Sequence, residues 1–289
     1  MSTDPGAHRL AVVGGGVMGT NIAALAIGHG VPVVLVEVGE QELAQARETI
    51  AFKLRHAQLT GKLPAGRTPA ELVFTVSLKD AAEAVTTVIE AVTEIAETKI
   101  EVLREVSRIV RPGTLLISNT SCIPIDEMAA AVARPEELVG VHFMNPAYMI
   151  EMVEVIRGPR TGDDTMKAVT ELLETLGRAC LVVNDAPGFV INRVLHPLIN
   201  AAALLVQNGV APVEVVDGLL EGCLGHTTGP LRTADLIGLD NLVDSLNVLY
   251  ERTGDESCRP CDLMLDLVRA GKHGRKTGEG FYDYGKVAS

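Results

Sequence analysis

The stretch RLAVVGGGVMGTNIAALAIGHGVPVVLVE, residues 9–37, decides the fold. A short apolar run leads into a glycine turn, a stretch of helical length follows, and a second apolar run ends it. Short apolar runs bounded by turn residues are typical of buried strands. Strand, turn, helix and strand within about thirty residues form one βαβ unit. The stretch therefore predicts two parallel strands joined by a helix.

The glycine turn, GGGVMG at residues 14–19, matches the pattern G-x-G-x-x-G. The first glycine of this pattern permits a tight turn, the second lets a pyrophosphate approach the backbone, and the third lets the helix pack closely on the strand. The helix N-terminus adds free N–H groups and the positive end of its dipole. We therefore predict a dinucleotide site whose pyrophosphate lies on the turn, at Gly14, Gly16, Val17, Met18 and Gly19.

A carboxylate follows at the end of the second predicted strand. Glu37 stands eighteen residues after Gly19. A carboxylate at this place can accept hydrogen bonds from the ribose hydroxyls of the cofactor, and it repels a 2′-phosphate. The sequence therefore predicts NAD, rather than NADP, as the cofactor.

Strand-like and helical patterns continue to alternate along the first half of the chain. A long amphipathic helix is expected at 40–59, and further apolar runs stand at 72–76, 85–92, 114–118 and 138–143. Alternation of this kind is typical of a parallel sheet covered by helices on both faces. The next run, 152–157, follows Asn145-Pro146 without a helix between, so we expect that strand to be antiparallel to its predecessor.

Strand patterns stop after a last run at 179–183. From Asp185 onward the patterns are helical, at 188–209, 213–224, 233–252 and 262–271. We therefore predict an α/β Rossmann-type domain at residues 1–185, which binds NAD, followed by an all-α domain at residues 186–289.

The antiparallel turn gives His142 and Glu154 a way to meet. On a single helix, twelve residues separate two side chains by roughly 18 Å along the axis. Across two neighbouring antiparallel strands, opposed Cβ atoms lie about 5 Å apart. A histidine can take or return a proton near neutral pH, and a paired carboxylate fixes its tautomer. The hairpin therefore predicts a histidine–carboxylate pair that can exchange a proton near neutral pH.

Composition limits the classes of partner. The net charge of −12 argues against nucleic acid, since phosphate binding needs a basic face. No apolar run has the length of a membrane span, and the first residues, MSTDPGAHRL, lack the form of a signal peptide. The five cysteines show no disulfide framework, and the pair Cys258 and Cys261 lacks a second pair or nearby histidine that would indicate a metal. We expect a cytoplasmic enzyme with reduced thiols and no bound metal.

Several motifs, in order, resemble those of the 3-hydroxyacyl-CoA dehydrogenase family. They are GGGVMG at 14–19, EAVTE at 90–94 with Lys99, SNTS at 118–121, HFMNP at 142–146, VEVI at 153–156, DAPGFVINR at 185–193, TGP at 228–230 and GRKTGEGFYDY at 274–284. The resemblance extends over nearly the whole chain. It implies a Rossmann-type domain followed by a helical domain that carries most of a homodimer interface.

The same resemblance assigns roles to single residues. His142 is implied to be the general acid/base, with Glu154 as its carboxylate partner. Ser121 and Asn192 match the positions that hydrogen-bond the substrate. Further contacts with the cofactor are implied for Glu94, Lys99, Asn145 and Lys276. In the loop between the catalytic pair, Tyr148 and Glu151 depart from the family, many members of which have smaller or basic residues there.

The substrate class follows from the resemblance and leaves the carrier open. The implied reaction interconverts 3-hydroxyacyl and 3-oxoacyl thioesters, as in a 3-hydroxybutyryl-CoA dehydrogenase of fatty acid metabolism. Lys53 and three neighbouring cations, at 55, 62 and 67, form either the contact region for the carrier's phosphates or a solvated helix face. CoA is favoured by its prevalence in the family. The segment 225–264 resembles a branch that oxidises short hydroxyacyl groups on an acyl carrier protein in polyketide biosynthesis.

Two alternatives to this function remain at the level of sequence. The β-hydroxyacid dehydrogenases share the glycine turn but use a catalytic lysine in the helical domain, and no matching motif is present. A non-catalytic protein that keeps the fold for binding would have no need of His142, Glu154, Ser121 and Asn192 together.

Overall fold

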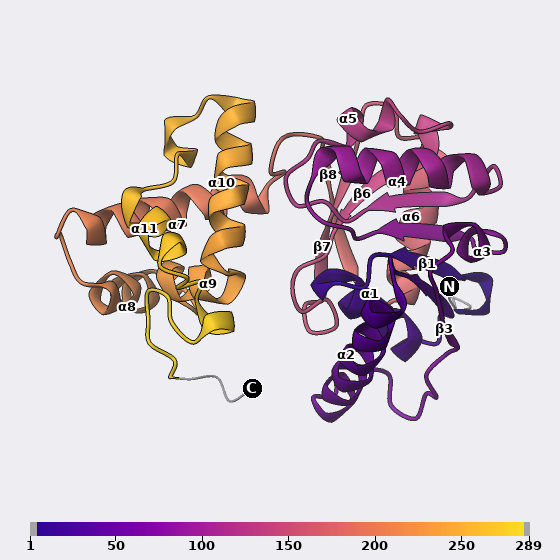
Figure 1. Cartoon of the computed structure of the whole chain (residues 1–289), viewed down its shortest axis with the longest axis horizontal. Coiled ribbons are helices and arrows are strands. Elements are labelled where there is room, and N and C mark those ends of the chain that lie inside the picture. The colour runs from indigo at the N-terminus through magenta and orange to yellow at the C-terminus, as the bar shows by residue number, and fades with distance from the viewer. Residues whose placement is uncertain (1–4, 286–289) are drawn as a thin grey trace. The chain divides into compact units, whose positions relative to one another are not determined.

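The computed structural model describes residues 5–285 and divides into two compact units. The first unit ends at Ala186 and the second begins at Pro187. The first is an α/β unit and the second is helical, so the predicted fold class is confirmed (Figure 1).

The first unit contains all eight strands of the sheet that the described residues form. Its elements are β1 (Leu10–Val13), α1 (Val17–Gly28), β2 (Val33–Val36), α2 (Glu40–Leu59), β3 (Leu72–Thr75), α3 (Leu78–Ala82), β4 (Thr87–Glu90), α4 (Ala96–Ile109), β5 (Leu115–Ser118), α5 (Ile125–Ala129), β6 (Leu138–His142), β7 (Met152–Arg157), α6 (Asp163–Thr175) and β8 (Ala179–Asn184). The predicted long helix at 40–59 is confirmed as α2.

The strand order is β3-β2-β1-β4-β5-β6-β7-β8. The chain runs outward from β1 in one direction and then, after β3, crosses back to β4 on the other side of β1. Ligands of open α/β sheets bind at such a switch point, outside the carboxyl ends of the strands. Neighbouring strands are parallel except β6 and β7, which are antiparallel, as predicted.

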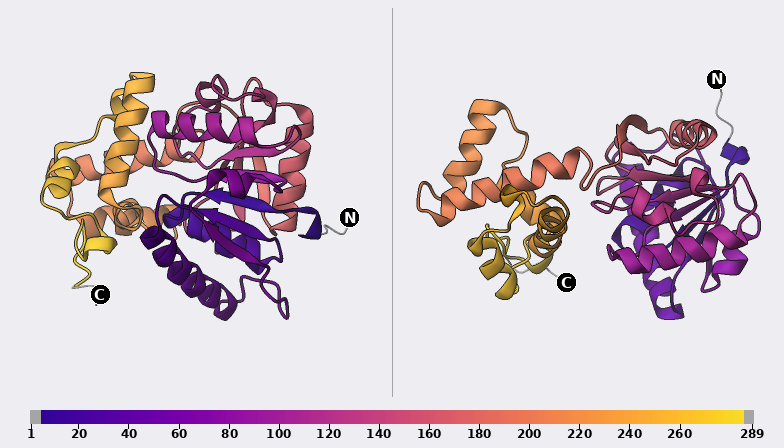
Figure 2. Two further views of the ribbon diagram at one scale, coloured as in Figure 1. Left: turned by 45° about the vertical axis from the view of Figure 1, so that its right-hand side comes forward. Right: turned by 90° about the horizontal axis from the view of Figure 1, so that it is seen from above.

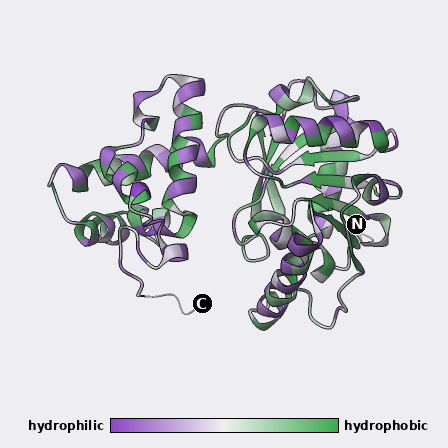
Figure 3. Cartoon of the chain, in the orientation of Figure 1, coloured by the Kyte–Doolittle hydropathy of each residue, from purple (hydrophilic) through white to green (hydrophobic). Residues whose placement is uncertain are grey.

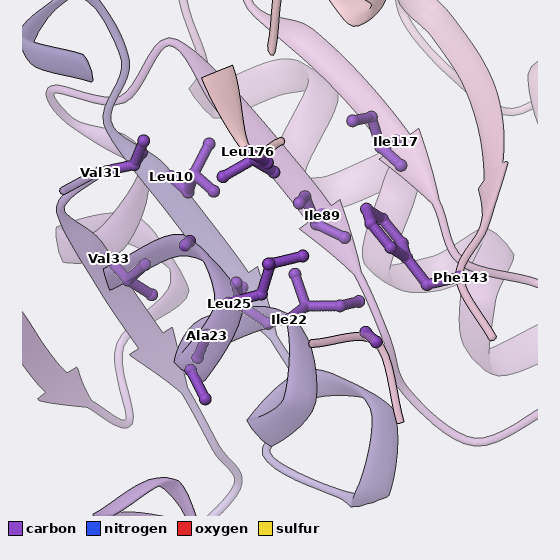
Figure 4. Packing of buried hydrophobic residues seen from close by; sticks show 14 of the residues in the cluster. Leu10, Ile22, Ala23, Leu25, Val31, Val33, Ile89, Ile117, Phe143 and Leu176 are labelled. Carbon is purple, nitrogen blue, oxygen red and sulfur yellow. The ribbon is translucent and has the colours of Figure 1, made fainter. Parts of the chain in front are cut away.

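Helices cover both faces of this sheet (Figure 2). Side chains from α1, α2 and α6 share one hydrophobic cluster with the strands, while α4 contacts α3 and α5. Because both faces are covered, β1, β2 and β4 are buried at every position. This explains why β1 and β2 are continuous apolar runs, whereas β4 begins with Thr87 and ends with Glu90. In the cluster, Ile22 and Leu25 of α1 pack beside Leu10 and Ile89 of the strands (Figure 4). In Figure 3 the strands are mostly hydrophobic, whereas α2 and α4 also carry many hydrophilic residues.

The second unit consists of helices around an apolar core of its own. They are α7 (Ile191–Gln207), α8 (Val213–Leu224), α9 (Pro230–Ile237), α10 (Leu239–Thr253) and α11 (Asp262–Arg269). The helical run expected at 233–252 is two helices, because Gly238 between them has φ +97°. That backbone conformation ends a right-handed helix and favours glycine. Among residues 5–285, no helix combines the length and the apolar character needed to cross a membrane.

A buried carboxylate fastens the C-terminal segment to the second unit. Asp235, on α9, accepts hydrogen bonds from the backbone N–H groups of Phe281 and Tyr282 and from the Tyr284 hydroxyl. A Cβ atom at Gly280 would lie 2.0 Å from the Asp235 carboxylate, so only glycine fits there. The motif GEGFYDY therefore has a structural explanation in this unit. Burial raises the pKa of Asp235, although its hydrogen bonds act in the opposite direction.

Replacing Asp235 by asparagine is expected to lower the free energy of unfolding by about 1–3 kcal/mol, because an amide offers one acceptor oxygen to three donors and leaves buried N–H groups unpaired. Urea unfolding followed by circular dichroism measures the change. Asp266→Asn is the control, since that side chain is 66% exposed and its loss should change stability by less than about 0.5 kcal/mol. Equal unfolding midpoints for Asp235→Asn and the wild-type protein would refute the fastening role.

The raised pKa of Asp235 also gives the sign of a pH effect. A carboxyl whose pKa is higher in the folded state binds its proton more tightly when folded. The stability that proton binding to Asp235 contributes is therefore complete below the unfolded pKa. It is lost as the pH rises through the folded pKa.

Candidate active site

His142 and Glu154 form a buried pair across the hairpin of β6 and β7. The two residues are register partners, and Nδ1 of His142 lies 2.9 Å from Oε2 of Glu154. Both residues are buried, with 5% and 7% of their surface exposed. The predicted contact is therefore confirmed. A proton on Nδ1 is donated to the carboxylate, which defines the orientation of the imidazole ring.

The loop after β5 lies against the residue that follows His142. Oδ1 of Asn119 accepts a hydrogen bond of 3.1 Å from the backbone N–H of Phe143. Parallel pairing of β5 and β6 places the ends of both strands at the same edge of the sheet. The structure therefore brings the loop that carries Ser121 to the end of the sheet where His142 lies.

A network of charged side chains supports this loop. Glu94 accepts hydrogen bonds from the Thr120 hydroxyl and from the backbone N–H groups of Ser121 and Cys122. Lys99 lies between two carboxylates, 2.8 Å from Glu90 and 3.2 Å from Glu94.

Lys99 is only 1% exposed, so its ammonium group lies inside the first unit. Its ammonium group binds Glu90 and Glu94, and the contact with the cofactor that the resemblance implied stays a prediction. Burial alone would lower the pKa of Lys99, but the charges of the two carboxylates outweigh burial and raise it. Any effect of Lys99 on a bound cofactor would therefore be transmitted by these carboxylates.

The glycine turn has the geometry that its sequence predicts. Gly14 has φ +101°, and a Cβ atom there would lie 2.6 Å from the carbonyl oxygen of Ala91. A Cβ atom at Gly19 would lie 1.7 Å from the carbonyl oxygen of Gly14. A Cβ atom at Gly16, by contrast, would meet nothing within 4 Å. The first and third glycines thus serve packing, and the second faces open space in which a ligand can approach the backbone.

Glu37 ends β2 beside this turn. Its carboxylate accepts hydrogen bonds from the backbone N–H groups of Gly15, at 2.5 Å, and Val38, at 2.9 Å. A carboxylate has about four acceptor positions, so these two contacts leave it able to accept hydroxyl donors as well. Glu37 therefore helps to define the turn and keeps acceptor positions for further donors.

A pocket of about 450 Å³ opens between the glycine turn, α2 and the loop after β6. Its lining residues are Gly15, Gly16, Val17, Thr20, Asn21, Gln45, Thr49, Lys53, Asn145, Pro146 and Tyr148. Asn145 is held there by a hydrogen bond of 3.1 Å from Asn21. No carboxylate lines this pocket, and its one charged side chain is Lys53.

The ammonium group of Lys53 is directed at the first turn of α1. It donates hydrogen bonds to the carbonyl oxygen of Val17, at 2.9 Å, and to the Thr20 hydroxyl, at 2.7 Å. Burial lowers the pKa of Lys53 to about 8. The prediction of a solvated helix face therefore does not describe this residue, which is half-buried at the pocket.

Asn192 and Lys276 belong to the second unit. Asn192 lies in the first turns of α7 and is 7% exposed. Nζ of Lys276 lies 2.5 Å from Oδ2 of Asp240. The structure thus brings together the predicted site residues of the first unit. For Asn192 and Lys276 it gives only their positions within the second unit.

Sequence reasoning missed the role of Glu90 and the side-chain partner of Tyr148. Glu90 reads as part of an apolar run, yet it is fully buried and binds Lys99, the Ser118 hydroxyl and the N–H of Val92. The signal was a carboxylate inside a strand pattern, which a buried position tolerates only with partners. Tyr148 was noted as a departure from the family, and its hydroxyl lies 3.2 Å from Nδ1 of His56.

The described residues contain no group of three or more histidine, cysteine, aspartate or glutamate side chains placed to hold a metal ion. The five cysteines are free thiols, and three of them are buried: Cys122, Cys258 and Cys261.

Comparisons with known proteins identify the family. Residues 9–186 match the NAD-binding domain of 3-hydroxyacyl-CoA dehydrogenase, and residues 188–284 match the C-terminal domain of the same enzymes. The first match confirms NAD as the cofactor. Among curated proteins, a probable 3-hydroxybutyryl-CoA dehydrogenase of Deinococcus radiodurans is 40% identical over 96% of this chain and its own whole length. A probable 3-hydroxybutyryl-CoA dehydrogenase of Bacillus subtilis is 39% identical over 97% of this chain and 99% of its own length.

A solved structure is also similar over both units. The (S)-3-hydroxybutyryl-CoA dehydrogenase of Ralstonia eutropha has a TM-score of 0.86 and 36% identity, over 96% of this chain and 99% of that one. The two family models together span nearly all of the chain, and the relatives above are 36–40% identical to it. The chain belongs to the 3-hydroxyacyl-CoA dehydrogenase family.

Proposed function

We propose that this protein interconverts 3-hydroxyacyl and 3-oxoacyl thioesters with NAD, and that His142 is its general acid/base. The observation that carries the proposal is the buried contact of 2.9 Å between His142 and Glu154 at the carboxyl edge of the sheet. Family membership favours this enzyme over a non-catalytic protein that binds NAD.

His142 has the chemistry that the reaction needs. In the direction of oxidation, Nε2 accepts the proton of the substrate hydroxyl while the carbon-bound hydrogen leaves as hydride. Bound NAD supplies the hydride acceptor. Glu154 stabilises the imidazolium and holds its Nδ1 proton, so that Nε2 is the nitrogen that exchanges protons with the substrate. In the reverse direction the imidazolium returns the proton to the 3-oxo oxygen.

The substrate contacts follow from the same assignment. Ser121 and Asn192 each donate or accept a hydrogen bond with the substrate, and Lys53 contributes a cation for the carrier. The pocket beside Lys53 and Asn145 is lined without carboxylates, which suits a ligand that carries phosphate groups.

The cofactor contacts are divided among several elements. The pyrophosphate lies on the glycine turn, at Gly14, Gly16, Val17, Met18 and Gly19, and the ribose is held by Glu37. Further contacts come from Glu94, Asn145 and Lys276, and Lys99 acts through Glu94. The open space at Gly16 and the position of Glu37 beside the turn support this arrangement.

Replacing Glu37 by serine is expected to raise kcat/KM with NADP relative to NAD by at least about tenfold, because the carboxylate that repels the 2′-phosphate is gone. Initial rates with each cofactor measure the ratio. Glu42→Ser, which removes an exposed carboxylate from the first turn of α2, is the control and should leave the ratio unchanged. A Glu37→Ser enzyme that keeps the wild-type ratio would contradict the ribose assignment.

The reaction itself is tested by incubating the protein with 3-hydroxybutyryl-CoA and NAD and following NADH absorbance. The names of the similar enzymes support this choice of substrate. NADH formation in proportion to 3-oxoacyl product is the expected result. Absence of turnover with the CoA thioester and with the same acyl group on a carrier protein would overturn the proposal.

A carrier protein is the second candidate for the substrate's carrier. Residues 49–70 contain four cations and no carboxylate, in a chain of net charge −12. This local excess of positive charge suits the phosphates of CoA and also an acidic carrier protein. Comparing kcat/KM for one acyl group on CoA and on a purified carrier protein decides between them. A hundredfold preference for the carrier protein, which corresponds to about 2.7 kcal/mol of transition-state discrimination, would assign the enzyme to polyketide biosynthesis.

We also propose that the second unit forms a homodimer. Helices α7 and α8 contact each other and expose large apolar side chains at Ile191, Val194, Leu198, Leu204, Leu205, Val215, Leu219 and Leu224. Exposed apolar groups of this extent are typical of protein interfaces. Sedimentation equilibrium measures the mass, and a monomer at micromolar concentration would contradict the proposal.

A further inference from the structure

Glu94 contacts three consecutive residues of the loop that carries Ser121. One oxygen, Oε1, accepts hydrogen bonds from the Thr120 hydroxyl at 2.6 Å, the Ser121 N–H at 2.7 Å and the Cys122 N–H at 3.0 Å. Three donors that converge on one oxygen leave the backbone around Ser121 little freedom. The carboxylate therefore defines the direction in which the Ser121 side chain leaves the loop.

The other oxygen of Glu94 is held from inside the unit. Oε2 lies 3.2 Å from Nζ of Lys99, and Lys99 in turn donates to Glu90 at 2.8 Å. Glu90 ends β4 and also accepts a hydrogen bond of 2.6 Å from Ser118, the last residue of β5. Lys99 of α4, itself held by Glu90 at the end of β4, thus fixes the Glu94 carboxylate, which belongs to a loop.

The charge state of Glu94 suits this role. Burial alone would raise the pKa of Glu94, but the charge of Lys99 and the hydrogen bonds from the loop hold it below its usual value. Glu94 is therefore ionised near neutral pH and can only accept hydrogen bonds. Hydrogen bonds to a charged acceptor are stronger than those between neutral groups.

The same loop is joined to the catalytic strand at its other end. Asn119 accepts a hydrogen bond from the N–H of Phe143, the residue after His142. The Thr120 hydroxyl, besides donating to Glu94, accepts a hydrogen bond of 3.0 Å from Ile123. The loop between Asn119 and Ile123 is thus fixed on the His142 side by Asn119 and on the α4 side by Glu94.

We propose that Glu94 is a positioning residue that holds Ser121 in place for the substrate, through three hydrogen bonds and with Lys99 as its anchor. The inference rests on the proposed function, because it takes Ser121 as a substrate contact. It goes beyond the cofactor contact proposed for Glu94, and the two roles differ in the kinetic constants that they change.

Replacing Glu94 by alanine releases all three donors. The expected result is a fall of about 10- to 100-fold in kcat with the thioester, since a displacement of about 1 Å in a positioned group can cost that much. The cofactor contact proposed for Glu94 is reported separately, by a rise in the KM for NAD, whereas positioning of Ser121 is reported by the fall in kcat. Glu97→Ala removes an exposed carboxylate from the first turn of α4 and should keep wild-type kinetics. A Glu94→Ala enzyme with a raised KM for NAD and an unchanged kcat would make Glu94 a cofactor contact only and overturn the inference.

The proposed route through Ser121 is tested by a double-mutant cycle. If Glu94 acts by positioning Ser121, adding Glu94→Ala to Ser121→Ala lowers kcat by less than about threefold beyond Ser121→Ala alone. Losses that multiply would show that Glu94 acts independently of Ser121 and would overturn the inference.

Glu94→Gln provides a second variant that keeps an acceptor oxygen for the loop. It should recover at least about tenfold of the kcat lost in Glu94→Ala, and a glutamine variant as slow as the alanine variant would contradict positioning by hydrogen bonds. All of these comparisons require a wild-type protein that turns over 3-hydroxybutyryl-CoA or its carrier-protein analogue. Failure of that first measurement refutes the proposed function, whereas multiplicative losses in an active enzyme refute only the role of Glu94.

Discussion

Replacing His142 by glutamine is expected to lower kcat by about 10²- to 10⁴-fold, the usual contribution of a positioned acid/base group. Glutamine keeps a donor that can reach the buried Glu154 carboxylate, so the loss reports on proton transfer and the hairpin should remain folded. The affinity for NAD should change little, because the glycine turn belongs to β1 and α1 and the hairpin to β6 and β7. Initial rates of NADH formation give kcat, and isothermal titration calorimetry with NAD gives the affinity for NAD.

His226→Gln is the matched control for that substitution. His226 is a half-buried histidine of the second unit, after α8, and no role in the chemistry is proposed for it. Its replacement should leave kcat within about twofold of wild type. If His142→Gln retained more than about a tenth of the wild-type kcat, His142 would not be the acid/base.

Replacing Lys99 by methionine is expected to lower the free energy of unfolding by about 3–5 kcal/mol, because Glu90 is then a buried charge without its counter-ion. Methionine has a similar length, so packing is conserved and the loss reports on charge. Glu90 is 0% exposed, which leaves no water to replace the ammonium group. Urea unfolding followed by circular dichroism measures the change.

A second substitution separates charge from packing at this site. Adding Glu90→Gln to Lys99→Met removes both buried charges and should recover part of the lost stability, since replacing a whole buried pair costs far less than removing one partner. A Lys99→Met protein as stable as wild type would contradict the buried pair.

The pH range of this pair follows from the direction of the shift. The carboxylates raise the pKa of Lys99 above its ordinary value in spite of burial. A group with a raised pKa stabilises the folded state fully below its unfolded pKa, and that contribution is lost as the pH rises through the folded pKa. The pair therefore stabilises the protein at neutral pH, and its contribution is lost only in the alkaline range.

The elements that were predicted correctly are those that local patterns determine. Apolar runs next to a glycine turn gave β1, α1 and β2, because β1 and β2 are buried on both faces and consist of apolar residues. The turn at Asn145-Pro146, without a helix between two strand patterns, gave the antiparallel hairpin and with it the contact of His142 and Glu154.

The features that were missed depend on contacts between distant segments. The resemblance implied a cofactor contact for Lys99, and only the fold shows that its side chain reaches Glu90, nine residues earlier on a buried strand. The contact of the Lys53 ammonium group with the first turn of α1, 36 residues away in sequence, was likewise not predicted; its role toward the carrier's phosphates stays a prediction. The division of the expected helix into α9 and α10 at Gly238 was also missed, because the spacing of apolar residues does not report the sign of φ at one residue.

The central claim is that His142 and Glu154 act as one catalytic unit, and a double-mutant cycle on kcat/KM tests it most directly. The four proteins are wild type, His142→Gln, Glu154→Gln and the double variant, assayed with 3-hydroxybutyryl-CoA and NAD. Glu154→Gln alone should lower kcat/KM at least about tenfold, because the imidazole loses its orienting carboxylate. In the His142→Gln background the same change should have an effect of less than about threefold, since groups that act as a unit are not additive. Two losses that multiply in the double variant would show that the residues act separately and would contradict the account.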